Sequence, residues 1–215
     1  MDIKKILSIP RSLYFNIRVF GMGGVKLPIV FSNKTRIKGL RKGCFICLKP
    51  DRRVFIGFDG VKGLESNSRT NIVVGPTGKI IFEGSAFVAA GSTIRVDEGT
   101  CTFGDAFSCN TNCFISCTRS VTFGKGCLLG WNVNVRDSDG HTIITADGRK
   151  DSLKEVVVGD NVWIAANVDI LKGVHIGNGN VIGYRSCVTK AVEDEHCLIG
   201  GYPAKVLTRN ISWER

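Results

Sequence analysis

The sequence predicts an all-β fold, a solenoid of stacked parallel strands, on the basis of two spacings and one feature of composition. Aliphatic residues recur at strict intervals of six, at Val158, Ile164, Ile170, Ile176, Ile182 and Val188. Small or branched residues hold the fifth place of nearly every unit, at Val162, Val168, Val174, Ser186 and Val192. The chain has 26 glycines but only 5 prolines, which suits tight corners. A coil whose flat sides each use one six-residue unit needs this spacing, whereas a helical period of 3.6 does not produce it.

The beginning of the chain differs from this pattern. Residues 1–20 predict one or two short amphipathic helices around Pro10, and Gly21 to Gly24 end them. From Val25 to Ser66 apolar and polar residues alternate irregularly, which is typical of opening coils. Terminal coils are atypical because they must cap an otherwise open apolar stack. We therefore assign residues 1–66 to a basic N-terminal segment with opening coils, within a single domain.

The regular repeat is assigned to residues 67–192. Further inward positions, with a shift of two after Val121, are Phe82, Val88, Ile94, Phe103, Cys109, Ile115, Val121, Phe123, Leu129 and Val135. Val135 and Val158 are separated by far more than one repeat unit, so about 17 residues must leave the solenoid. This predicts an excursion loop at 136–157. Residues 193–215 are expected to form a turn, a final strand pair and a short helical tail carrying Trp213.

The net charge of +10 lies entirely at the N-terminal end. Residues 1–60 hold thirteen Lys and Arg against three Asp, whereas residues 61–215 hold sixteen charged residues of each sign. One interpretation is an anionic partner: a membrane surface met by residues 1–20, a lipid-diphosphate-linked sugar or an acidic glycan. The other is a solvated basic face. No nucleic-acid partner is predicted.

The cysteines and the first residues of the chain indicate whether a metal site is present and in which cellular compartment the protein is expected. Nine cysteines are present, and Cys44 and Cys47 form one C-x-x-C without a second pair or a histidine at zinc-finger spacing. We interpret the cysteines as small buried apolar residues and predict no metal site. Residues 1–18 lack the apolar core and the cleavage site of a signal peptide, so we expect a cytoplasmic protein, with the inner face of the membrane as the alternative location.

Several motifs resemble those of the hexapeptide-repeat acyltransferases, in particular the C-terminal half of galactoside, maltose and polysaccharide O-acetyltransferases. They are Val157 to Ile164 (VVGDNVWI), Ile176 to Gly183 (IGNGNVIG), Val188-Thr189-Lys190 and Gly201 to Val206 (GYPAKV). The resemblance implies a left-handed parallel β-helix and transfer of acetyl groups from acetyl-CoA. The chain departs from the family at Ala165, where glycine is common, at Lys172, where proline is common, and at Tyr184-Arg185, where Ala-Gly is typical.

The predicted catalytic residue is His141, in the excursion loop. A sugar hydroxyl needs a general base with a pKa near 7 to attack a thioester, and the family uses a histidine of a similar G-H segment for this. Asp137 and Asp139 are candidates to orient the ring, and Asn134 is a candidate to orient it or to bind the acceptor. The cysteines fit core positions and no G-x-S-x-G motif occurs, which favours direct transfer over a covalent enzyme intermediate. Alternatively, His141 is an ordinary surface histidine.

The predicted acetyl-CoA site is in the last coils. Trp163 should project outward, which indicates either a ligand or subunit packing. The resemblance implies that Trp163 lines the pantetheine channel, that amides around Ala165 and Ala166 bind the thioester arm, and that basic residues meet the phosphates. The full set of candidates is Trp163, Ala165, Ala166, Tyr184, Arg185, Thr189, Lys190 and Lys205.

Two other functions remain open at this stage. The chain could be a non-catalytic β-helix that serves as a scaffold or binding module, or an N-acyltransferase acting on a nucleotide-linked amino sugar. The G-H loop followed by the Trp163 motif favours an O-acetyltransferase acting on a sugar, in surface polysaccharide or glycolipid synthesis. Family members build sites between subunits, so we predict a homotrimer.

Overall fold

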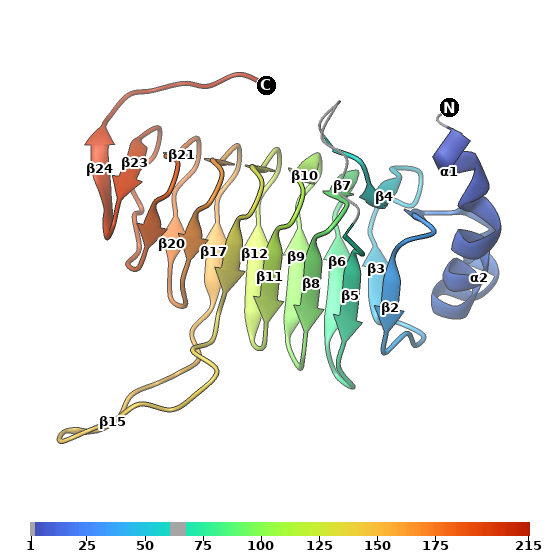
Figure 1. Ribbon diagram of the computed structural model, residues 1–215, viewed down its shortest axis with the longest axis horizontal. Coiled ribbons are helices and arrows are strands. Elements are labelled where there is room, and N and C mark those ends of the chain that lie inside the picture. The colour runs from blue at the N-terminus through green and yellow to red at the C-terminus, as the bar shows by residue number, and fades with distance from the viewer. Residues whose placement is uncertain (1–2, 61–67) are drawn as a thin grey trace.

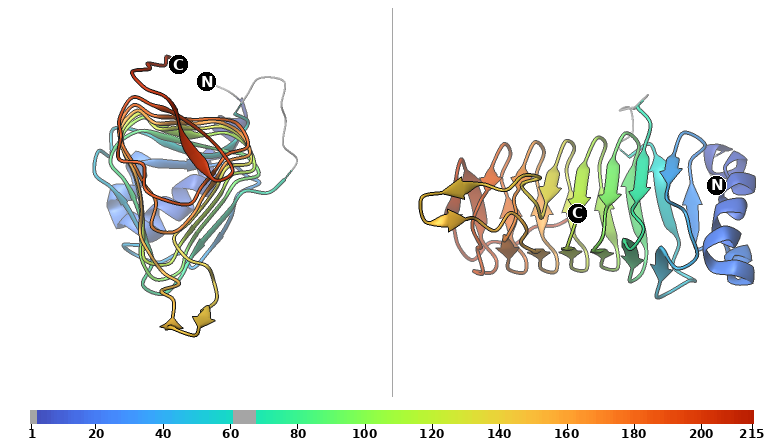
Figure 2. Two further views of the ribbon diagram at one scale, coloured as in Figure 1. Left: turned by 90° about the vertical axis from the view of Figure 1, so that its left-hand side faces the viewer. Right: turned by 90° about the horizontal axis from the view of Figure 1, so that it is seen from below.

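The computed structural model describes residues 3–60 and 68–215, and the boundary expected at residues 66 and 67 lies outside them. The chain is a left-handed parallel β-helix with a triangular cross-section, as the sequence predicts (Figure 1, Figure 2). Each coil places one short strand on each of three parallel sheets, in the order first, second, third. Residues 20 apart, such as Phe103 and Phe123, therefore pair in neighbouring coils.

Within residues 3–60 and 68–215, the three sheets contain all strands except those of one small hairpin. The first sheet consists of β1 (Ile29–Phe31), β4 (Val54–Phe58), β7 (Ala86–Ala89), β10 (Phe107–Cys109), β13 (Leu128–Leu129), β18 (Trp163–Ile164), β21 (Val181–Ile182), β23 (Leu198–Gly201) and β24 (Ala204–Thr208). The second consists of β2 (Arg36–Lys38), β5 (Asn71–Val74), β8 (Thr93–Val96), β11 (Phe114–Cys117), β14 (Asn134–Arg136), β19 (Asp169–Ile170) and β22 (Cys187–Val188). The third consists of β3 (Phe45–Cys47), β6 (Lys79–Phe82), β9 (Thr100–Phe103), β12 (Ser120–Phe123), β17 (Val156–Val158) and β20 (His175–Ile176).

The core fills the interior of the prism, and the six-residue positions predicted to face inward are all buried. Identical residues also stack from coil to coil. The Phe82, Phe103 and Phe123 rings lie nearly parallel, with centroids 5.2 and 5.6 Å apart. Seven of the nine cysteines, from Cys44 to Cys197, are fully buried between such positions, and Cys187 is nearly so. Each coil thus repeats the apolar contacts of its neighbours, which explains why the pattern is legible in the sequence.

The N-terminal end is closed by helices α1 (Ile3–Leu7) and α2 (Ile9–Phe20) and the 3-10 helix η1 (Gly21–Lys26) (Figure 1). Pro10 lies in the first turn of α2, where its missing N–H costs nothing. Two polar side chains of α2 bond to the edge strand β1. Ser12 Oγ exchanges hydrogen bonds with the backbone of Phe31, and the Asn16 amide does so with Ile29. These side chains take the place of a neighbouring strand.

The excursion loop leaves the solenoid between β14 of the second sheet and β17 of the third. It carries an antiparallel hairpin, β15 (Ile144–Thr145) and β16 (Gly148–Arg149). The excursion covers residues 137–155 and is slightly shorter than the predicted 136–157, because Arg136 ends β14 and Val156 begins β17. The loop projects away from the prism at the corner between the second and third sheets (Figure 1, Figure 2). The first sheet forms the opposite face.

The C-terminal end contains the expected strand pair, β23 and β24, but the predicted helical tail is wrong. Residues 209–215 contain no helix and run back along the first sheet (Figure 1). The Ile211 N–H donates to the His196 carbonyl, and Arg215 donates to the carbonyls of Ala106 and Cys127. The tail is therefore held by contacts with distant coils rather than by its own backbone. Among the described residues, no helix is long and apolar enough to cross a bilayer.

Candidate functional site

His141 lies in the excursion loop, just before the β15–β16 hairpin, and is exposed. It takes no part in the packing of the coils. The other two histidines belong to the solenoid: His175 is in β20, with Nε2 3.7 Å from a Glu155 carboxylate oxygen, and His196 is in the last turn. His141 is thus the histidine that stands outside the stacked structure, as predicted.

Asp137 does not have the orienting role that the sequence suggested. It is fully buried at the root of the loop, and its Oδ2 accepts hydrogen bonds from the N–H groups of Arg119 and Ser120 at 2.6 and 2.8 Å. The Thr118 N–H lies 2.9 Å from Oδ1 and 3.1 Å from Oδ2. Both oxygens are therefore occupied by the turn of the preceding coil. Asp137 positions the base of the loop and not the imidazole of His141.

Asp139 also has a partner other than the histidine. Its Oδ2 lies 2.8 Å from the Lys172 ammonium group, and Lys172 donates a further bond to the Asp151 carbonyl. Lys172 thereby bonds to both legs of the loop where they leave the coils. The departure from the family at this position has a structural reason: a proline could not make either contact.

Asn134 lies in β14, directly before the loop. Its amide donates to Asp169 Oδ1 at 2.8 Å, and its Oδ1 accepts a bond from the Arg136 guanidinium at 3.2 Å. The Arg136 Nε is buried and has no hydrogen-bond partner among the residues that the structure describes. This polar group on the second sheet, next to the loop, is compatible with the predicted role of Asn134 in holding an acceptor.

A separate groove of about 390 Å³ lies at the corner between the first and second sheets. Four residues of the predicted coenzyme site line it: Trp163, Ala165, Ala166 and Tyr184. The other lining residues are Asn110, Leu128, Gly130, Trp131, Trp213, Glu214 and Arg215. The groove is bordered by exposed aromatic rings, which offer apolar surface to a ligand.

The corners of three successive coils explain the shape of this groove. Trp131, Ala166 and Tyr184 occupy equivalent turns, linked by Asn167 N–H to the Trp131 carbonyl and by Arg185 N–H to the Ala166 carbonyl. Ala166 is small and lies between two exposed aromatic residues, so it leaves a slot. The Ala165 N–H already donates to the Ile182 carbonyl at 2.8 Å. The Ala166 N–H has no hydrogen-bond partner within the described part of the chain. This N–H, and not that of Ala165, is therefore left to donate to a ligand oxygen.

Sequence reasoning missed the contribution of Trp213 to the groove. The Trp213 ring lies 6.0 Å from that of Trp163, centroid to centroid, and its Nε1 donates to the Asn161 carbonyl at 2.8 Å. Two residues further on, Arg215 Nη2 donates a hydrogen bond to Ser108 Oγ at 3.2 Å. Neither residue belongs to a repeat, and the tail was expected to be helical, so no periodic signal could have placed them here.

The predicted basic residues are not gathered at this groove. Arg185 follows Tyr184 at the corner, with its guanidinium carbon 5.5 Å from the centre of the Tyr184 ring. Its φ of 56° is left-handed, which explains why the family usually has glycine there. Thr189 and Lys190 are exposed beyond β22, at another corner, and Lys205 is exposed on β24. Their contacts with the coenzyme's phosphates therefore stay a prediction.

Buried thiols do not provide a nucleophile. Burial raises the pKa of Cys47, Cys117 and Cys127 to about 12 each, so these thiols are protonated at neutral pH. Burial also raises the pKa of the Cys101 thiol well above its usual value. A thiol in this state is a poor nucleophile, which favours the histidine loop as the site of chemistry.

The loop and the groove lie on different sides of the prism. The loop leaves the corner between the second and third sheets, whereas Trp163 belongs to the first sheet (Figure 2). Within one subunit, Trp163 therefore does not stand beside the loop. A complete site with both parts requires the loop of one copy to reach the groove of another.

Comparison with known proteins identifies relatives of this chain. Residues 155–190 match the family model of the bacterial transferase hexapeptide (six repeats). The chain is 31% identical over 133 residues to the putative lipopolysaccharide biosynthesis O-acetyl transferase WbbJ of Escherichia coli (strain K12), covering 56% of this chain and 67% of that protein.

A second relative is the polysialic acid O-acetyltransferase of Escherichia coli O1:K1 / APEC. The two are 38% identical over 136 residues, which is 62% of this chain but only 42% of that protein. Among solved structures, the polySia specific acetyltransferase NeuO matches with 27% identity and a TM-score of 0.46, over 87% of this chain and 89% of that one.

Proposed function

The chain belongs to the hexapeptide-repeat acyltransferase family, and from this premise we propose that it transfers an acetyl group from acetyl-CoA to a sugar hydroxyl. The acceptor we propose is a surface polysaccharide or a glycolipid precursor, since the relatives are described as acetyltransferases of polysialic acid and of lipopolysaccharide synthesis. The observation that carries the proposal is the position of His141, exposed on a loop that the solenoid itself does not need.

The proposed chemistry is direct transfer. His141 takes the proton of the acceptor hydroxyl, and the oxygen attacks the thioester carbonyl. The Ala166 N–H is the donor available in the groove for the charge that develops on the carbonyl oxygen. The carbon–sulfur bond then breaks, and the proton held by His141 passes to the departing thiolate of coenzyme A. The acetyl group ends on the acceptor oxygen and the proton on the thiol of coenzyme A, and no covalent enzyme intermediate is formed.

We further propose a homotrimer with a site between neighbouring subunits, since the His141 loop and the Trp163 groove are on different sides of one chain. Mixed trimers test this. A chain with His141→Ala and a chain with Trp163→Ala are each expected to be nearly inactive. Mixing the two after unfolding and refolding should restore activity at about a quarter of the interfaces, where both intact halves meet.

Two outcomes decide the trimer experiment. Simple mixing of folded trimers, without exchange of subunits, is the control and should restore nothing. If refolded mixtures gain no activity although native mass spectrometry shows mixed trimers, or if light scattering shows that the active species is a monomer, the shared site is ruled out.

The tail residue Trp213 should contribute to acetyl-CoA affinity. Trp213→Ala removes one wall of the groove and the contact with the Trp163 ring, so we expect the Kd for acetyl-CoA to rise about 2- to 10-fold. Calorimetric titration measures it. Ser212→Ala, at an exposed position of the same tail, is the matched control and should change nothing. Equal affinities of the Trp213 variant and the wild type would place the coenzyme elsewhere.

The atom that receives the acetyl group, oxygen or nitrogen, distinguishes the proposed O-acetyltransferase from an N-acyltransferase, and a scaffold would transfer no acetyl group. Candidate glycans incubated with acetyl-CoA and the protein should gain acetyl groups detectable by mass spectrometry, and mild alkali should remove them, because esters are labile and amides are stable. An alkali-stable product would indicate an N-acyltransferase. Binding of glycan without any transfer would indicate a scaffold.

A further inference from the structure

The outer face of the N-terminal cap, made of α1, α2 and η1, is apolar. Helices on a protein surface usually turn most of their large apolar side chains inward. Here the buried side is mixed: Ser8, Ser12 and Asn16 face the coils together with Val19, and the Phe15 ring packs on that of Phe31. Other apolar residues lie on the opposite side, with Ile3 70% exposed, Tyr14 55%, Ile17 42% and Met22 81%. The helix α2 therefore buries a side of mixed polarity and leaves a second, apolar side without a partner among the described residues.

This exposure is concentrated at one end of the molecule. Of the fifteen large hydrophobic side chains exposed in the described residues, seven lie between Ile3 and Val25, and the other eight are distributed from Leu48 to Leu207. The cap is at the extreme end of the solenoid (Figure 1), away from the corner from which the excursion loop emerges. Neither the coenzyme groove nor the loop explains it.

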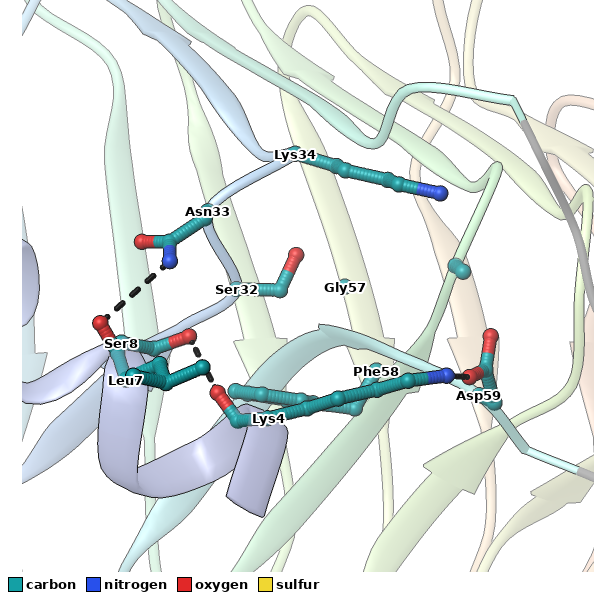
Figure 3. Close-up of a pocket in the computed structure, with 10 residues that line it drawn as sticks. Lys4, Leu7, Ser8, Ser32, Asn33, Lys34, Gly57, Phe58 and Asp59 are labelled. Carbon is teal, nitrogen blue, oxygen red and sulfur yellow. Dashed lines mark hydrogen bonds and ion pairs between the residues drawn. The ribbon is translucent and has the colours of Figure 1, made fainter. Parts of the chain in front are cut away.

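Not every basic residue near the cap is available to a partner. Lys4 spans the pocket of about 210 Å³ between α1 and the first coils and pairs with Asp59 at 2.7 Å (Figure 3). Lys5 lies over the Phe55 ring at 4.4 Å, and Arg11 donates to the Asn33 and Thr35 carbonyls. These three cations hold the cap onto the coils.

Two cations accompany the apolar face instead. Arg18 is exposed on α2 beside Tyr14, whose hydroxyl it bonds at 3.1 Å, and Lys26 is exposed at the end of η1. Around them, residues 1–60 have an excess of ten positive charges. End-to-end packing of two copies would bring two such surfaces together and is opposed by their repulsion. An anionic lipid bilayer, in contrast, carries a charge of opposite sign at its surface and has an apolar interior that can take up the exposed side chains.

We propose that the cap docks onto an anionic lipid bilayer, with the apolar residues Tyr14, Ile17, Met22 and Val25 entering the headgroup region and Arg18 and Lys26 meeting lipid phosphates. This is the arrangement by which interfacial amphipathic helices bind membranes. In the proposed trimer with parallel solenoids, three caps lie at the same end and bind together, which strengthens the attachment. The docking itself depends on neither the trimer nor the enzymatic reaction.

Vesicle flotation tests the proposal with the full chain. The wild type should float with vesicles that contain phosphatidylglycerol in phosphatidylcholine and should not float with phosphatidylcholine alone. The double variant Ile17→Gln with Met22→Gln should lose binding, whereas Leu48→Gln, an equally exposed apolar residue outside the cap, should not. Because these side chains are exposed, thermal unfolding and acetyl-CoA binding should be unchanged in all three proteins.

A charge series provides the second arm. Arg18→Gln with Lys26→Gln should weaken binding about fivefold per charge, an effect that added salt reproduces. Lys79→Gln with Lys125→Gln removes the same charge from exposed positions on the coils and should have little effect. The proposal is overturned if the wild type does not float, if the cap variants float like the wild type, or if Met22→Gln abolishes an end-to-end dimer in the absence of lipid.

Discussion

Replacing His141 by alanine is expected to lower kcat for acetyl transfer by about a hundredfold to ten-thousandfold, the usual contribution of a general base. The thermal unfolding temperature should not change, because the side chain is exposed on a loop outside the stacked core. The affinity for acetyl-CoA should also be retained, since the groove proposed to hold the coenzyme is lined by residues such as Trp163 and Ala166 and keeps all of them. Steady-state kinetics, calorimetric titration and circular dichroism measure the three quantities.

The matched control is His175→Ala. His175 is also partly exposed and lies in a coil beside Glu155, but no predicted catalytic residue is near it in the sequence or in the described contacts. Its removal should leave turnover near normal. If the His141 variant keeps its activity, or if the His175 variant loses as much, His141 is not the base and the assignment of the loop fails.

Repetition explains which parts of this fold could be predicted. Each inward residue, such as Ile164 or Ile170, repeats the environment of its neighbours one coil away, so the constraint of the core appears many times in the sequence. The loop was equally visible, since an insertion interrupts a period that is otherwise kept. Both conclusions follow from local spacing, and neither requires knowledge of which coils face each other.

The parts that could not be predicted depend on contacts between distant residues. Trp213 meets Trp163 because the tail runs back over the first sheet, and its own sequence carries no sign of that path. The orientation of the cap was also hidden: α2 has large apolar residues on more than one side, and its sequence does not say which side the coils bind. Here the side chains of Ser12 and Asn16 decide it by pairing with β1.

The acidic residues of the loop illustrate the same limit. Proximity in sequence suggested that Asp137 and Asp139 serve His141, but both carboxylates have nearer partners in three dimensions. Asp137 reaches back to the turn of the preceding coil, and Asp139 reaches Lys172. A carboxylate beside three backbone N–H groups in a turn gives no sequence signal apart from the aspartate itself.

Replacing Asp137 by alanine is therefore expected to lower the stability of the fold, and its main effect is not on the catalytic step. Its carboxylate is fully buried and accepts bonds from the N–H groups of Thr118, Arg119 and Ser120. Alanine would leave these donors without an acceptor, at about 1–3 kcal/mol for each one that stays buried. A total of about 3–5 kcal/mol is a large part of the 5–15 kcal/mol that stabilises a typical domain. Circular dichroism should show a much lower unfolding temperature.

Two further variants separate a structural role of Asp137 from a catalytic one. Asp137→Asn keeps one acceptor oxygen but places an amide donor among the N–H groups, so its unfolding temperature should fall between those of the wild type and the alanine variant. Asp139→Asn breaks a partly exposed ion pair with Lys172 and should cost less than about 1 kcal/mol. If Asp137→Ala unfolds like the wild type but loses turnover as His141→Ala does, its carboxylate acts on the imidazole in the assembled enzyme. That outcome would contradict the structural role proposed for the hydrogen bonds between Asp137 and the turn.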